Sequence, residues 1–281
     1  MSVSIFDNTQ CLLGEGPLWH PEREQFFWFD IKNKSLHSNL DGKTTTQSFD
    51  EFVSAAGWVD RDTLLMASET GLYRYDIGSG ERSLVAPLEA DNPTTRSNDG
   101  RADPFGGFWI GTMGKEGQDN AGAIYRFYRG ELRTLYPDIS ISNSICFSPD
   151  RKFAYFTDTR VGKIMRQPLD PDHGWPQGEP TVLIDLTVVG LHPDGSVVDA
   201  QGCIWNAQWG AARVSKYSAD GQFLSQVDLP ADQTTCPAFG GPDLTDLFVT
   251  SAGEGAKGAD QGKTFLVSGA GKGQAEHQVI L

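Results

Sequence analysis

The chain has 281 residues, 38% of them apolar, which is enough for a sizeable hydrophobic core. Its 37 acidic and 23 basic residues give a formal net charge of −14, which repels the phosphates of nucleic acids and of anionic lipids and argues against both as partners. No long apolar run predicts a membrane helix and no secretory signal opens the chain, so we expect a cytoplasmic protein. Four scattered cysteines without a CxxC pair favour neither a zinc-thiolate site nor a disulfide framework.

Six similar segments follow one another, each with an apolar strand, an acidic turn, an aromatic-rich strand and a further alternating strand. They cover residues 17–42, 56–81, 100–113 with 122–132, 145–170, 196–221, and 237–252 with 262–269. Large apolar residues mark equivalent positions at steps of 37, 44, 46, 50 and 43 residues: Trp28, Leu65, Trp109, Tyr155, Trp205 and Phe248. Four-stranded propeller blades repeat at about 40 to 50 residues. The sequence therefore predicts an all-β fold, a six-bladed β-propeller with four-stranded blades around a central channel.

The two ends of the chain, "SVSIFD" and "HQVIL", both read as strands. We expect one of them to complete the last blade and close the ring, but the sequence does not say which. Residues 1–281 are predicted to form one propeller domain.

An oxygen-bearing side chain precedes the aromatic marker by eleven to thirteen residues in four of the repeats: Glu15, Asn98, Asn143 and Asp194. The innermost strand of a propeller blade lines the central channel, so these four side chains should converge near the axis. Two carboxylates and two amides suit a hard divalent ion such as Ca²⁺, Mg²⁺ or Mn²⁺. The alternative is that the Asn and Asp of "NDG" and "PDG" only form turns, although "GEGP" and "ISNSI" are not ordinary hairpin sequences.

Several segments together resemble the SMP-30/gluconolactonase/regucalcin family across nearly the whole chain. They are "LLGEGPLWHPEREQFFWFDI", "RSNDGRADPFGGFWIGTM", "ISNSICFSPDRKFAYFTDT", "PDGSVVDAQGCIWNAQWG" and "CPAFGGPDLTDLFVTSA". The last but one is most similar to the bacterial sugar lactonases, including xylonolactonases and arabinolactonases. The resemblance implies one divalent ion on the propeller axis, held by Glu15, Asn143 and Asp194. It also implies substrate contacts from Arg96 and Asn98.

Two positions depart from the family pattern. Ser144 stands where many members have a glycine beside a metal ligand. Gln118 stands, by its spacing from "GAIY", where some members have a substrate-contacting glutamate, so we expect Gln118 to contact the substrate without adding a charge.

These features predict a sugar lactonase that opens a pentono- or hexonolactone to its acid, with Asp194 as the catalytic base for an attacking water. The alternatives are a promiscuous esterase or phosphotriesterase with the same metal, and a non-catalytic calcium-binding propeller. The natural metal (Ca²⁺, Zn²⁺, Mn²⁺ or Fe²⁺) and the choice between monomer and homodimer stay open. It also stays open whether His192, Trp58 or Trp209 lines the pocket; for the two tryptophans, packing in the core is the default expectation.

Overall fold

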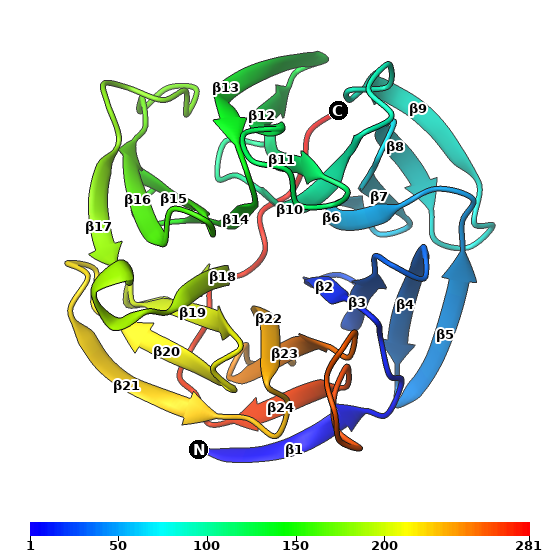
Figure 1. The fold of residues 1–281 in the computed structure, drawn as a ribbon. Coiled ribbons are helices and arrows are strands. Elements are labelled where there is room, and N and C mark those ends of the chain that lie inside the picture. Colours follow the sequence, from blue (N-terminus) through cyan, green and yellow to red (C-terminus); the bar gives the residue numbers. More distant parts are fainter.

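The computed structural model describes all 281 residues and contains 24 strands and one short 3₁₀ turn, Thr187–Val189. The strands form six four-stranded antiparallel sheets arranged in a ring (Figure 1). This confirms the predicted six-bladed β-propeller. No helix of the structure is long and apolar enough to cross a bilayer.

Five blades are built from four consecutive strands, the first innermost and the fourth at the rim (Figure 1). Blade 1 has β2 (Gly14–His20), β3 (Gln25–Asp30), β4 (Ser35–Leu40) and β5 (Lys43–Ser48); blade 2 has β6 (Val53–Asp60), β7 (Thr63–Ser68), β8 (Gly71–Asp76) and β9 (Arg82–Pro87). Blade 3 has β10 (Thr95–Ala102), β11 (Phe108–Gly114), β12 (Gly122–Tyr128) and β13 (Glu131–Ile139); blade 4 has β14 (Ser142–Phe147), β15 (Phe153–Asp158), β16 (Lys163–Pro168) and β17 (Thr181–Asp185). Blade 5 has β18 (His192–Val198), β19 (Ile204–Trp209), β20 (Arg213–Tyr217) and β21 (Phe223–Asp228).

The sixth blade closes the ring with strands from both ends of the chain. It contains β22 (Gln233–Gly240), β23 (Asp246–Ala252), β24 (Thr264–Ser268) and, as its outermost strand, the N-terminal β1 (Ser2–Asp7). Phe6, at the bulge of β1 between the paired residues Ile5 and Asp7, packs edge-on against Phe26 of blade 1 and Phe248 of blade 6. The N-terminal strand thus answers the question of closure that the sequence left open.

All six repeat markers lie on the second strand of their blade and are buried. The hydrophobic residues form six clusters, and each cluster lies between two neighbouring blades. The core is therefore divided between the blades, which leaves the axis free for polar groups.

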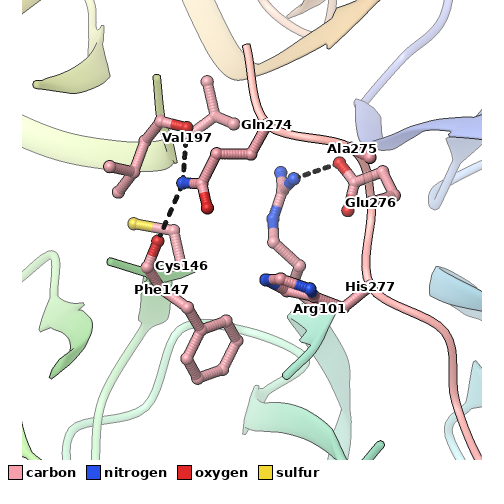
Figure 2. Close-up of a pocket in the computed structure, with 9 residues that line it drawn as sticks. Arg101, Cys146, Phe147, Val197, Gln274, Ala275, Glu276 and His277 are labelled. Carbon is pink, nitrogen blue, oxygen red and sulfur yellow. Dashed lines mark hydrogen bonds and ion pairs between the residues drawn. The ribbon is translucent and has the colours of Figure 1, made fainter. Parts of the chain in front are cut away.

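The C-terminal segment is not a strand of any blade, although its sequence resembles one. It crosses the axis (red in Figure 1) and contacts the C-terminal ends of the innermost strands β10, β14 and β18. The Gln274 amide donates to the carbonyls of Phe147 and Val198, and Glu276 forms a buried ion pair with Arg101 (Figure 2). We call residues 270–281 the C-terminal strap, since they close the channel at this end around a cavity of only about 20 Å³.

Candidate active site

The opposite end of the innermost strands carries the four predicted oxygen ligands, and β-bulges set their positions. In blades 1 and 4 the ligand is the last paired residue before the bulge, and the next residue, Gly16 or Ser144, has a φ of 54° or 59°. In blades 3 and 5 the ligand itself, Asn98 or Asp194, lies in the bulge. The four predicted ligands therefore occupy neighbouring rather than identical positions of the repeat. The bulges interrupt the regular alternation of side chains between the two faces of the strand and so re-aim these side chains.

A directed chain of hydrogen bonds orients the polar side chains. Arg96 Nη1 donates to Asn98 Oδ1 over 2.8 Å, and Asn98 Nδ2 donates to Asn143 Oδ1 over 3.1 Å. Asn143 Nδ2 in turn donates to Thr159 Oγ1 over 2.9 Å, and that hydroxyl donates to the Pro193 carbonyl over 2.7 Å. Each amide oxygen keeps one lone pair, because an amide oxygen has two acceptor sites and only one is used.

Three buried carboxylates gather at this end of the channel. Burial, and then the charge of Asp99, raise the pKa of Glu15 to about 8. Burial followed by the charges of Glu15 and Asp99 raises the pKa of Asp194 well above its usual range. Burial raises the pKa of Asp99 to about 6. Burial also lowers the pKa of the nearby Arg96 guanidinium, to about 10, so Arg96 is still charged at neutral pH.

This donor set fits a divalent cation. Buried carboxylates are stable in the charged form only when a positive partner compensates them. Arg96 compensates Glu15, and Arg101, the cation nearest to Asp99, is already paired with Glu276, so the carboxylates remain in excess. Glu15 accepts one hydrogen bond, from the Gly16 N–H, and Asp194 accepts none from any side chain. Free carboxylate and amide oxygens of this kind are ligands for hard ions.

A cavity of about 200 Å³ opens above these groups. Its polar lining consists of Glu15, Arg96, Asn98, Asn143, Thr159 and Asp194, and its apolar lining of Leu13, Met113, Ile141 and Trp209. All the predicted ligands therefore share one cavity with Arg96, the predicted substrate contact beside Asn98. Trp209 lines it as well, so the default expectation that Trp209 serves in core packing was wrong.

Three other candidates lie elsewhere. Gln118 is exposed in the loop after β11, where its side chain accepts a hydrogen bond from the Glu116 N–H, and it does not line the cavity. His192 is exposed at the start of β18 and is also absent from the lining. Trp58 packs between blades 1 and 2 and donates to the Glu276 carbonyl of the strap, in agreement with a packing role.

Sequence reasoning missed Asp99 and Thr159. Asp99 accepts the Ile145 N–H over 2.7 Å, which ties the bulge of blade 3 to the innermost strand of blade 4. Thr159 belongs to the quoted "FTDT" segment, but nothing in its spacing distinguished it from the neighbouring Thr157. Its position next to Asn143 depends on the pairing of β14 with β15, and only the structure gives that.

A second cluster of ligand-type residues lies in blade 1. Single ligand atoms of Cys11, Asp30 and His37 come within 4.8 Å of one another. The Asp30 oxygens already accept four hydrogen bonds, from the N–H groups of Leu12, Leu13 and Asn33 and from the Asn33 amide. A carboxylate with about four acceptor sites has none left for a metal, so this cluster fixes the chain that enters blade 1.

Residues 13–253 match the family described as the SMP-30/Gluconolactonase/LRE-like region. The chain is 35% identical to the pentonolactonase XacC of Haloferax volcanii, over 96% of this chain and 93% of the relative. It is 36% identical to a 6-deoxy-6-sulfogluconolactonase of Pseudomonas putida, over 86% and 84%. The crystal structure of a calcium-binding protein, regucalcin, from Agrobacterium tumefaciens superimposes with a TM-score of 0.96 at 42% identity, covering 99% of this chain and 97% of that one.

The fold and the cavity lining define a propeller with an acidic cavity, the candidate site, at one end of its channel. Together with these matches, they show that the chain belongs to the SMP-30/gluconolactonase/LRE-like family.

Proposed function

We propose that the protein hydrolyses an aldonolactone to the open sugar acid in the axial cavity, with the help of one divalent metal ion. Its family and its relatives make it a lactone-hydrolysing enzyme. The main support for a metal ion at this site is the convergence of Glu15, Asn143 and Asp194 in one buried cavity that has an excess of carboxylates.

Glu15, Asn143 and Asp194 would hold the ion, because their oxygens line the cavity and retain free lone pairs. An ion held there would supply Lewis-acid polarisation of the lactone carbonyl. Which divalent metal the cell provides depends on availability as well as on ligands.

Asp194 is the residue best suited to accept the proton of the attacking water. Its carboxylate lies in the cavity and is not engaged by any side-chain donor. The lining contains no serine or cysteine, and the Thr159 hydroxyl already donates its proton to the Pro193 carbonyl, which favours water over a side-chain hydroxyl or thiol as the nucleophile. General-base assistance of this kind contributes about 10²- to 10⁴-fold in rate.

Arg96 and Asn98 would bind the hydroxyl groups of the substrate. Arg96 uses Nη1 for the Ser97 carbonyl and Asn98, and no protein acceptor engages its remaining nitrogens. A guanidinium with free donors is well suited to sugar oxygens. Gln118, predicted to contact substrate, would have to reach the cavity by movement of its loop.

A substrate panel tests the proposal. Purified protein, stripped with chelator and then reloaded with Mn²⁺ or Ca²⁺, is assayed by pH-stat against five- and six-carbon aldonolactones and against paraoxon, with spontaneous hydrolysis subtracted. We expect metal-dependent turnover of the lactones, with pentonolactones preferred, and little turnover of the phosphotriester. Full activity after chelation would refute the metal's role, and faster turnover of paraoxon than of every lactone would favour the phosphotriesterase.

A further inference from the structure

We propose that Thr159 is a positioning residue of the metal site: its hydroxyl fixes the amide of Asn143 and joins blade 4 to the β-bulge that carries Asp194. This inference rests on the proposed metal site and names a residue outside the ligand set.

The first step is the orientation of the Asn143 amide. Thr159 Oγ1 accepts a hydrogen bond from Asn143 Nδ2 over 2.9 Å. An amide can present either its oxygen or its NH₂ group to a cation, and only the oxygen can bind it. Because Thr159 holds the NH₂ group from one side and Asn98 donates to the oxygen from the other, the amide oxygen of Asn143 is held at the cavity.

The second step is the link between blades. The same hydroxyl donates its proton to the Pro193 carbonyl over 2.7 Å, and Pro193 directly precedes Asp194 at the bulge of β18. The hydroxyl therefore donates its only proton to blade 5 and accepts one hydrogen bond from blade 4. It ties a ligand of blade 4 to the peptide that positions a ligand of blade 5.

The third step is that a second hydroxyl makes a matching link below the first. The Ser144 hydroxyl donates to the carbonyl of Asp194 and accepts from Ser196 Oγ over 2.9 Å. Blades 4 and 5 are thus joined by two hydroxyl groups beside the two ligands. Thr159 differs from Ser144 in that it lines the cavity and bonds directly to a ligand side chain.

Residues that orient metal ligands typically contribute about 10- to 100-fold to metal affinity. The test is Mn²⁺ binding without substrate, measured by the signal of free Mn²⁺ in electron paramagnetic resonance. Thr159→Val keeps the shape and removes both hydrogen bonds, so we expect its dissociation constant for Mn²⁺ to rise by about 10- to 100-fold. Thr159→Ser should recover most of this loss, because it restores the hydroxyl.

The matched control is Thr157→Val in β15, two residues before Thr159, where the hydroxyl donates to the Lys163 carbonyl and makes no hydrogen bond to a ligand side chain. It should bind Mn²⁺ like the wild type. Thr159→Ala serves as a second variant if Thr159→Val does not fold, and the same expectation applies to it.

Asn143→Ala separates the two hypotheses. Weak Mn²⁺ binding by Asn143→Ala together with wild-type binding by Thr159→Val or Thr159→Ala would overturn the role of Thr159 and leave the metal site intact. Wild-type binding by Asn143→Ala would overturn the proposed metal site itself.

Discussion

Substitution of Glu276 by glutamine should destabilise the propeller, because it removes the charge that balances Arg101 at the closed end of the channel. The two side chains form an ion pair of 2.5 Å and are only 8% and 11% exposed (Figure 2). Burial raises the pKa of Glu276 despite its partner, whereas the acidic groups around Arg101 raise the pKa of the guanidinium. We take the charged pair as the resting form, since the two groups are in direct contact and arginine stays protonated at all ordinary pH values.

The size of the effect follows from the surroundings of Arg101. Loss of one partner of a buried ion pair costs about 3 to 5 kcal/mol, because it leaves an uncompensated charge. The charge of Asp99 also favours the Arg101 cation, so the lower end, about 3 kcal/mol, applies here. In a protein of this size, that corresponds to a fall of roughly 6 to 12 °C in Tm.

Urea denaturation and melting curves measure this loss. Glu131→Gln is the matched control, since the Glu131–Arg133 pair has a similar distance, 2.6 Å, but its side chains are more than half exposed; exposed pairs of this kind contribute little to stability. The double variant Arg101→Met with Glu276→Gln should regain part of the loss, because no buried charge remains. A loss of less than about 1 kcal/mol for Glu276→Gln would show that the strap does not depend on this ion pair.

Four further predictions concern the site and the strap. Asp194→Asn should lower kcat at saturating metal by about 10²- to 10⁴-fold with little change in Tm, and near-equal kcat values would make Asp194 a turn residue or a spectator ligand. Glu15→Gln should weaken Ca²⁺ binding measured by calorimetry, and unchanged affinity would remove Glu15 from the ligand set. Burial lowers the pKa of His277 to about 4, so its neutral form stabilises the folded state above about pH 6.5 and this contribution is lost as the pH falls towards 4; His277→Asn should flatten that part of the stability profile. Ser144→Ala should be less stable than Ser144→Gly by about 1 kcal/mol in urea denaturation, because φ is 59° there, and the reverse order would exclude strain at this residue.

The sequence by itself was sufficient for the blade count and for the ligand candidates. A hydrophobic marker on the second strand of each blade repeats because every blade must bury the same face against its neighbour, and this periodicity is local in the chain. The polar residues that precede the markers are recognisable in the sequence, because the start of a channel-lining strand faces the axis and not a hydrophobic core. Glu15 and Asp194 were therefore visible without coordinates.

The tertiary structure decided what depends on contacts between distant segments. The ends "SVSIFD" and "HQVIL" have the same strand-like pattern, yet only the first finds an open sheet edge, on β24. The second follows the ion pair of the strap, and its Val279 and Ile280 N–H groups donate to the Trp58 and Gly106 carbonyls instead of to a sheet. Trp209, at the end of β19, and Thr159, one residue past β15, line the cavity because antiparallel pairing places the ends of these second strands beside the starts of the innermost strands β18 and β14. Neither position has a local pattern of its own, since a tryptophan or threonine at the end of a strand looks the same whether it faces a neighbouring blade or a substrate cavity.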